Sequence, residues 1–352
     1  MPHSCFLTVV VPAYNVEKYL SRCLDSLLHQ TQMAHKVIII NDGSIDATPS
    51  IAKRYADQYP DLFDFISQEN HGLGAARNVG IRNAKTDYVT FLDSDDWVPP
   101  RFVEIISERL GRETSPVDIL FDLPVNYNMA TGGFEEWSDT ALLKELFHDP
   151  YRVASPRQDP RLYALEPSVC RCVFYTDFLR SHNFSFPEGT KWEDVLPHFQ
   201  LFHWATRCIA TTDTGFCYRI NSGNQITSTS SEDRLQVFSV FENTLAYAID
   251  NDWSDIEISY IMRSLCIFVD WSLNCASLKV RKPYVESLHK FYKEIPGSFF
   301  KKYYRDLSIP RRERLFVSLA KMPLLYKVIK NEHYYRVLRG VAKRAKRIVK
   351  KH

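Results

Sequence analysis

Short apolar segments alternate with helical segments over the first hundred residues, and this alternation restricts the possible fold more than any other feature. Four runs rich in β-branched and aromatic residues have the length of buried strands, at Leu7–Val11, Val37–Ile40, Phe63–Ile66 and Tyr88–Leu92. Apolar residues with helical spacing lie between them, at 16–30, 46–59 and 73–84. This order predicts an α/β fold whose strands are parallel and joined by right-handed crossovers.

Polar residues come directly after three of these strands. They are Tyr14-Asn15, Asn41-Asp42 and Asp93-Ser94-Asp95. The carboxyl ends of parallel strands meet at one edge of a sheet, so these side chains are expected to lie together. Two carboxylates one residue apart can bind one divalent cation, and that cation can hold a diphosphate. Taken alone, Asp93 and Asp95 also fit an Asp-rich turn that binds nothing.

Four motifs in this half of the chain resemble those of glycosyltransferase family 2. They are Val11-Pro12-Ala13-Tyr14-Asn15, Asn41-Asp42-Gly43-Ser44, Asn70 to Asn78, and Asp93-Ser94-Asp95-Asp96. Their order and spacing are similar to those of the family. The resemblance implies the GT-A fold, a mixed, mostly parallel sheet flanked by helices, and a reaction that inverts the anomeric centre of a nucleotide-sugar.

The resemblance also implies a role for each residue of the donor site. The nucleoside is expected against Pro12, Ala13, Tyr14 and Asn15, with a uracil N–H on Asp42 and the base or diphosphate within reach of Arg77. From the residues alone, Asp42 instead caps its own turn, Tyr14 is a core aromatic, and Arg77 is an exposed helix arginine.

The metal site is expected at the end of the fourth strand. The resemblance implies that Asp95 binds Mg²⁺ or Mn²⁺ directly. Asp93 then contacts the ribose, or the metal through water, and Ser94 lies between them in the donor site. The metal would offset charge on the departing UDP.

The second half of the catalytic region supplies the expected base. Phe186 to Asp194 resembles the loop of the family that ends in a Glu-Asp pair, which implies that Asp194 deprotonates the acceptor hydroxyl. Glu193 is the nearest alternative, and Asp194 also fits a helix N-cap. Arg219 is expected to neutralise leaving-group charge, or else to be a loop arginine in solvent. Val169-Cys170-Arg171 departs from the Trp-x-Lys stretch of the family, a difference expected to alter the acceptor side.

Three further segments have weaker signals. Asn126 to Gly133 is polar and contains glycine, which indicates an acceptor-side loop. The segment 149–160 is rich in Pro, Arg and Asp, a composition typical of a mobile loop. Cys208 to Cys217 and Tyr218-Arg219 are expected to form two short strands.

Composition divides the chain into three parts. We expect a catalytic domain at 1–230, with a nucleotide-sugar half at 1–110 and an acceptor half at 111–230. A helical subdomain follows at 231–310, and then a basic amphipathic tail at 311–352. The tail holds 14 of the 44 Lys and Arg but only two of the 42 Asp and Glu, a net charge of +12 beside −10 for the remainder.

The tail favours an anionic membrane surface as partner. Docking on the acidic body or on a neighbouring subunit, which would give a homo-oligomer, is the alternative. No recognition module accompanies the basic run, so nucleic acid is not an expected partner. No signal peptide, membrane span or CxxC pair is found, which predicts free thiols and a cytoplasmic protein attached peripherally to the inner face of the plasma membrane.

The sequence therefore predicts a metal-dependent, inverting glycosyltransferase. Its donor is a UDP-sugar, its acceptor is a glycan or lipid-linked saccharide, and its role is in bacterial cell-surface polysaccharide synthesis. A non-catalytic, membrane-associated assembly factor that binds nucleotide-sugars is one alternative. A nucleotidyltransferase is another alternative. The lack of a Gly-rich loop after the first strand argues against it.

Overall fold

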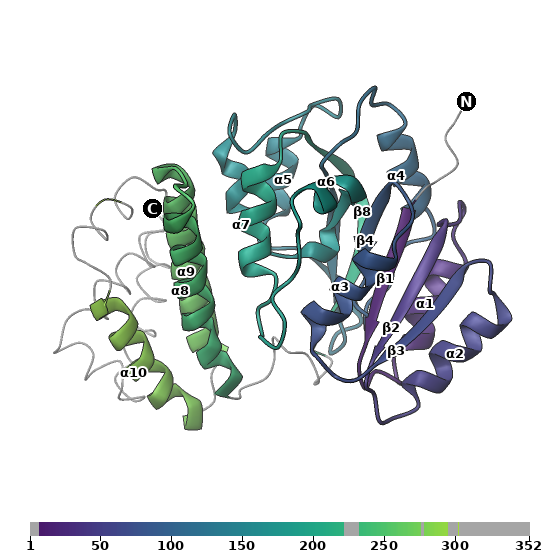
Figure 1. Cartoon of the computed structure of the whole chain (residues 1–352), viewed down its shortest axis with the longest axis horizontal. Coiled ribbons are helices and arrows are strands. Elements are labelled where there is room, and N and C mark those ends of the chain that lie inside the picture. Colours follow the sequence, from purple (N-terminus) through teal and green to yellow (C-terminus); the bar gives the residue numbers. More distant parts are fainter. Residues whose placement is uncertain (1–6, 222–231, 276–277, 295–301, 303–352) are drawn as a thin grey trace. The chain divides into compact units, whose positions relative to one another are not determined.

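The computed structural model describes residues 7–221, 232–275, 278–294 and 302. The chain divides into two compact units, Met1–Gln225 and Ile226–His352. The first unit is an α/β structure and the second is helical in the residues described (Figure 1). The predicted basic tail, 311–352, lies outside the described residues.

The first unit is built on an eight-stranded mixed sheet in the described part of the chain. The strands are β1 Leu7–Ala13, β2 Lys36–Asp42, β3 Phe63–Gln68, β4 Tyr88–Phe91, β5 Ile119–Asn128, β6 Gly133–Glu136, β7 Cys172–Tyr175 and β8 Cys208–Ile220. Their order is β3-β2-β1-β4-β7-β5-β6, and β8 pairs with β5. The first four are parallel, and β7 runs antiparallel to β4 and β5. The predicted mixed sheet, parallel in its first half, is confirmed.

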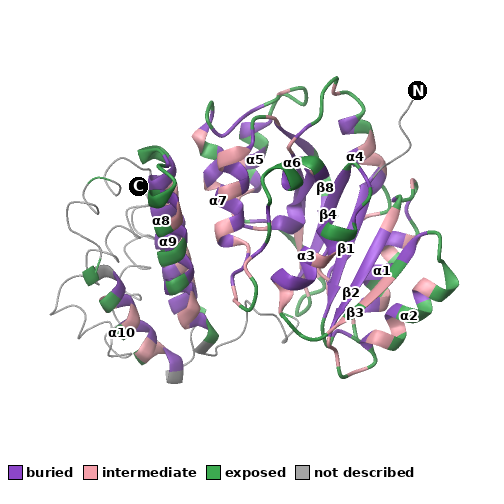
Figure 2. Cartoon of the chain, in the orientation of Figure 1, coloured by how far each residue is buried: buried purple, intermediate pink, exposed green. Residues whose placement is uncertain are grey.

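Helices flank this sheet (Figure 1). They are α1 Leu20–Leu28, α2 Thr48–Gln58, α3 Leu73–Asn83, α4 Phe102–Leu110, α5 Thr140–Leu146, α6 Thr176–Ser181 and α7 Val195–Trp204. Strands β1, β2 and β4 are buried along almost their whole length (Figure 2). A Cβ at Gly80 would lie 2.2 Å from Val10 Cγ1, so only glycine lets α3 approach β1 this closely.

The strand order places a ligand crevice at one point of the sheet. The chain adds β2 and β3 on one side of β1 and then crosses back to add β4 on the other. Ligands of open α/β sheets bind beyond the carboxyl ends of the strands at such a reversal. Tyr14 and Asn15 follow β1 there, and Asp93 to Asp95 follow β4.

Two predictions about the second half of the sheet are wrong. Asn126 to Gly133 is loop only at its centre, because Asn126 to Asn128 end β5 and Gly133 begins β6, and the two strands pair as an antiparallel hairpin around the turn 129–132. Cys208 to Arg219 is one strand rather than two. Strand β8 stays paired with β5 through two register shifts between Phe121 and Val125.

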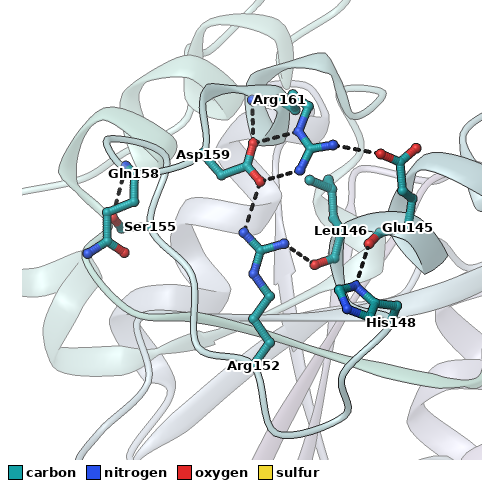
Figure 3. A network of polar contacts seen from close by, with 8 residues as sticks. All are labelled: Glu145, Leu146, His148, Arg152, Ser155, Gln158, Asp159 and Arg161. Carbon is teal, nitrogen blue, oxygen red and sulfur yellow. Dashed lines mark hydrogen bonds and ion pairs between the residues drawn. The ribbon is translucent and has the colours of Figure 1, made fainter.

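The segment 149–160 is held by a network of charged side chains, although its composition suggested a mobile loop (Figure 3). Asp159 accepts hydrogen bonds from Arg152 Nη2 at 2.9 Å and from Arg161 Nε and Nη2 at 2.8 and 2.6 Å. Arg161 also donates to Glu145 on α5 at 2.6 Å. These bonds to two guanidiniums lower the pKa of Asp159, so the carboxylate stays ionised within the network.

The second unit contains a 3₁₀ turn, Glu232–Leu235, and helices α8 Gln236–Asp250, α9 Asp255–Cys275 and α10 Leu278–Glu294. Phe238 on α8 packs against Tyr284 on α10, with ring centroids 4.9 Å apart. Arg234 is buried and lies 5.1 Å from the centre of the Trp271 ring on α9. The predicted helical C-terminal region is therefore present. Among the helices described, none combines the length and the apolar character needed to cross a bilayer.

Candidate active site

Asp42 lies at the end of β2, where it fixes the loop that precedes α3. Its Oδ1 accepts hydrogen bonds from Gln68 Nε2 at 2.7 Å and from the His71 amide at 3.0 Å. Its Oδ2 accepts from the Gly72 amide at 2.9 Å. The carboxylate thus holds this neighbouring loop in place, whereas the Ser44 amide of its own turn donates to Asn41 Oδ1. Its remaining lone pairs can still accept from a ligand.

The loops after β1 and β2 are joined by direct hydrogen bonds. The Asn15 amide donates to Ser44 Oγ at 3.0 Å, and Asn15 Oδ1 accepts from the Ile45 amide at 2.9 Å. Pro12 and Ala13 are buried in β1, whereas Tyr14 is 53% exposed. Tyr14 is therefore not a core aromatic, and its ring is open to a ligand.

Arg77 is buried on α3 and connects two parts of the site that are distant in sequence. Its Nη2 donates to Asp93 Oδ1 at 3.0 Å, and its Nη1 donates to Glu193 Oε1 at 2.7 Å. Cys170 Sγ is 3.8 Å from Nη2. Burial works against the charge of this guanidinium, but Asp93 and Glu193 raise its pKa above the usual value. The alternative of an exposed helix arginine is wrong, and the guanidinium is held by protein carboxylates.

The loop that carries Glu193 and Asp194 is anchored to the same helix. Asn78 on α3 donates from Nδ2 to the Phe186 carbonyl at 3.0 Å and accepts from the Phe186 amide at 2.7 Å. A Cβ on Gly74 would lie 2.1 Å from the Pro187 carbonyl oxygen, so glycine is needed for this contact. Helix α3 therefore sets the position of the predicted base relative to the strand ends.

Asp194 is half-buried at the N-cap position of α7, but its side chain makes no capping hydrogen bond. Its neighbour Glu193 is buried and engaged by Arg77. Burial, and then the negative charge of Glu193, raise the pKa of Asp194 to about 8, although Arg77 opposes the shift. A carboxylate with a pKa near neutrality is suited to general base work. Of the adjacent pair, Glu193 serves the ion pair and Asp194 has the properties of a base.

His198 lies one turn further along α7 and takes no part in this group of charged side chains. Its ring packs between Phe199 and Phe202, with centroids 5.0 and 4.1 Å away. Burial lowers its pKa to about 3, so the imidazole is neutral at physiological pH.

Three carboxyl groups follow β4 within four residues. Asp93 faces Arg77, and Asp95 is half-buried. Ser94 lies between them and is buried, as is Asp96. Burial and the nearby charge of Asp93 raise the pKa of Asp95 to about 6. Asp96 accepts from the Arg219 amide through Oδ1, and its Oδ2 has no partner in the described part of the chain.

These carboxyl groups fit a divalent cation. Hard cations such as Mg²⁺ and Mn²⁺ prefer oxygen ligands, and Mg²⁺ is commonly held by one or two carboxylates together with substrate phosphates. A cation between Asp93 and Asp95 would remove the mutual repulsion that disfavours their joint ionisation. The described residues contain no group of three or more His, Cys, Asp or Glu side chains placed to hold a metal by themselves. Diphosphate oxygens would therefore have to supply part of the coordination.

Arg219 is buried at the end of β8 and closes the site behind the carboxyl groups. Its Nε donates to the Asp95 carbonyl at 2.7 Å. Its guanidinium carbon lies 4.6 Å from the Tyr19 ring centre and 4.8 Å from that of Trp97. The alternative of a loop arginine in solvent is wrong, because only 3% of the residue is exposed.

Comparison with known proteins agrees with this geometry. The profile of "Glycosyl transferase family 2" matches residues 8–146, which include the loops after β1, β2 and β4 and the start of α3. Over these residues, which lie in the N-terminal half of the chain, the sequence is similar to this family. The chain is 28% identical over 281 residues to the putative glycosyltransferase EpsH of Bacillus subtilis, covering 75% of this chain and 77% of EpsH. The chain is therefore similar to glycosyltransferases in the order of its motifs.

Other similarities are shorter in sequence or lie in the fold. Glycosyltransferase GlyA of Streptococcus pneumoniae is 45% identical over 104 residues, which are 30% of this chain and only 15% of GlyA. The crystal structure of S. aureus TarS 1-349 in complex with UDP-GlcNAc superposes with a TM-score of 0.69 over 94% of this chain and 91% of TarS, at 18% identity. The GT-A fold expected from the sequence is therefore confirmed.

Several features of the site have no clear signal in the sequence. The Arg77–Glu193 ion pair joins residues 116 positions apart. Cys170 lies beside Arg77, while Arg171 turns away and donates from Nη1 to both carboxylate oxygens of Asp139, at 2.8 and 2.6 Å. In the segment that departs from the family pattern, the cysteine thus lies at the active site and the arginine is structural.

Proposed function

We propose that this protein is an inverting, metal-dependent glycosyltransferase that transfers a sugar from a UDP-sugar to a glycan or lipid-linked saccharide acceptor. One observation carries the proposal. Arg77 joins Asp93, in the expected diphosphate site, to Glu193, the neighbour of the expected base. Donor-binding and base-bearing segments are thereby fixed in a single buried ion-pair network at the switch point of the sheet.

In this mechanism each residue has a separate task. Asp42 and Tyr14 receive the nucleoside, as the family resemblance implies. Asp95, with Asp93, would hold Mg²⁺ or Mn²⁺, which supplies Lewis-acid stabilisation of the charge on the UDP leaving group. Asp194 takes the proton from the acceptor hydroxyl as that oxygen attacks the anomeric carbon, and UDP departs from the opposite face. Arg219 adds positive charge behind Asp95.

The fold of TarS supports a UDP-sugar as donor, because TarS was crystallised with UDP-GlcNAc. A role in cell-surface polysaccharide synthesis is supported by similarity to the minor teichoic acid biosynthesis protein GgaB of Bacillus subtilis, which is 34% identical over 115 residues, 32% of this chain and 13% of GgaB. We propose that the tail, 311–352, brings the enzyme to the inner face of the plasma membrane, since its net charge of +12 favours an anionic surface. If deletion of 311–352 leaves binding to anionic liposomes unchanged, the membrane proposal fails.

The decisive experiment replaces the expected base. UDP release from a panel of UDP-sugars is measured with Mn²⁺, with acceptor glycans present, for wild type and Asp194→Asn. We expect the variant to lose transfer by about 10²–10⁴-fold, the usual contribution of a general base, while UDP affinity is retained. Equal transfer rates would reject Asp194 as base. If the wild type releases no UDP from any donor, the alternative of a non-catalytic binding protein is favoured.

A further inference from the structure

A row of aromatic rings extends from the carboxyl groups after β4 to the edge of the sheet, where its last ring is exposed. Tyr127 on β5 pairs directly with Phe134 on β6 and with Arg219 on β8. Cross-strand partners project from the same face of a sheet. Their rings form a series, with Trp97 and Tyr127 centroids 5.1 Å apart and Tyr127 and Phe134 centroids 5.2 Å apart.

The row begins at the proposed metal site. Trp97 is two residues from Asp95, and its ring lies against the Arg219 guanidinium, whose Nε donates to the Asp95 carbonyl. The Arg22 guanidinium covers Trp97 at 3.7 Å. Exposure then rises outwards, since Trp97 is buried, Tyr127 is half-buried and Phe134 is 61% exposed.

Phe134 is an unusual residue for its position. Strand β6 lies at the end of the sheet order, and its next two residues, Glu135 and Glu136, are exposed charges of the kind that protect an edge strand. Met129, in the turn of the same hairpin, is also 40% exposed. Exposed apolar side chains that gather beside a site commonly mark a binding surface.

The hairpin that carries these rings is held in place from its other side. Asn128 Nδ2 donates to Glu135 Oε1 at 2.7 Å, and Asn221 Nδ2 donates to Asn128 Oδ1 at 3.0 Å. The rings are therefore presented by a braced strand pair, and binding would not require the hairpin to form anew.

The strand order determines which part of the donor and acceptor lies next to this aromatic row. Asp42 and Tyr14 are the expected nucleoside contacts, and they lie at the end of β2 and directly after β1. The carboxyl groups follow β4, and the aromatic row lies beyond them on β5 and β6. A donor that extends from the nucleoside end to the metal therefore directs its sugar toward the aromatic side, where the acceptor must also enter.

We propose that Tyr127 and Phe134 form an acceptor subsite that stacks against a pyranose ring of the glycan, one or more sugar units away from the unit that is modified. The apolar C–H face of a pyranose packs on an aromatic ring, and two successive rings suit an acceptor of at least two sugars. This inference rests on the proposed glycosyltransferase function and specifies its acceptor as an oligosaccharide.

The test separates acceptor binding from donor chemistry. Full-length wild type, Phe134→Ala, Phe134→Trp and Tyr151→Ala are applied, with UDP and Mn²⁺, to an array of immobilised oligosaccharides and their component monosaccharides. Tyr151 is a matched control, an aromatic residue that is 69% exposed on the segment 149–160. UDP release from UDP-sugar by hydrolysis, without acceptor, is measured in parallel for each protein.

We expect the wild type to bind oligosaccharides in preference to monosaccharides. Phe134→Ala should weaken that binding roughly two- to tenfold, the range for loss of one aromatic stacking contact, and Phe134→Trp should retain it. Hydrolysis of UDP-sugar should be equal in all four proteins. An unchanged array profile in Phe134→Ala, an array to which the wild type does not bind, or a parallel loss of hydrolysis would overturn the subsite. Failure of the proposed function would appear separately, as no hydrolysis by the wild type.

Discussion

The ion pair between Arg77 and Glu193 predicts how the activity should depend on pH. Glu193 is, after burial, the largest cause of the raised pKa of Asp194, which is about 8. Replacing Glu193 by Gln removes one negative charge beside the base but keeps an acceptor for Arg77. The pKa of Asp194 should therefore fall, and the acidic limb of the kcat/KM profile should move to lower pH.

The size of the effect follows from the ionised fraction of Asp194. With a pKa of about 8, about half of the carboxyl groups are ionised at pH 8 and about 1% at pH 6. Wild-type kcat/KM should then fall about fiftyfold between pH 8 and pH 6. Each unit by which Glu193→Gln lowers the pKa should raise activity at pH 6 about tenfold relative to wild type, equivalent to about 1.4 kcal/mol.

The assay is UDP release with saturating Mn²⁺ from pH 5.5 to 9, fitted as kcat/KM to obtain the pKa of the free enzyme. Glu108→Gln is the matched control, because Glu108 is an exposed carboxylate on α4. Thermal unfolding across the same pH range shows whether the variant stays folded, since Arg77 loses one of its two charged partners. An acidic limb that stays in place or moves to higher pH would refute the electrostatic coupling of Glu193 and Asp194.

Three further outcomes follow from buried or clustered charges. Arg77→Met should destabilise the fold by about 3–5 kcal/mol in urea denaturation, because it leaves Asp93 and Glu193 without their buried partner, whereas Arg82→Met on the exposed side of α3 should change little. Asp122 is buried, with no hydrogen-bond partner for either carboxylate oxygen within the described residues, and burial raises its pKa to about 7. As pH rises from about 4 to 7, the Asp122 carboxyl keeps its proton in the folded state but loses it in the unfolded state. The free energy of unfolding of the wild type should therefore fall over this interval by at most about 4 kcal/mol. Asp122→Asn should have a flatter profile of melting temperature against pH. Removing divalent metal with EDTA should weaken UDP binding by calorimetry, with recovery on addition of Mn²⁺; equal affinity in EDTA would contradict the metal assignment.

The first half of the fold could be predicted because its information is local. Strands covered on both faces are continuous apolar runs, and β1, β2 and β4 are buried along almost their whole length. The carboxyl ends of parallel strands lie at one edge of the sheet, whichever side chains follow them. Asp42 and Asp93 could therefore be placed in the same crevice from the sequence, before their contacts were known. The second half of the sheet gave weaker signals, because the antiparallel pairing of β5 with β6 and the parallel pairing of β5 with β8 depend on partners that the local sequence pattern does not specify.

The contacts of individual side chains in the site could not be derived in this way. Arg77 has the pattern of an ordinary helix residue, and only the approach of the loop after Phe186, which Gly74 and Asn78 permit, places Glu193 beside it. Likewise, the sequence gives two adjacent carboxylates but not which one is engaged. That distinction arises from the direction in which the chain enters α7, with Trp192 in the left-handed region at φ 62°.

The charge balance of the site explains why Arg77 faces protein carboxylates. Five carboxyl groups, Asp93, Asp95, Asp96, Glu193 and Asp194, lie in two short segments, and Arg77 pairs with one residue of each. Without this guanidinium the segments would repel one another, and the base could not be held near the donor. The pairing still leaves Asp95 and Asp194 without an ion-pair partner in the described part of the chain, so a diphosphate would meet excess negative charge. A divalent cation at Asp95 would reverse that local charge, and Asp194 would stay free for the acceptor proton. Donor binding and base catalysis can therefore share one acidic crevice, because Arg77 pairs with a carboxylate of each segment and a divalent cation would neutralise the remaining charge on the donor side.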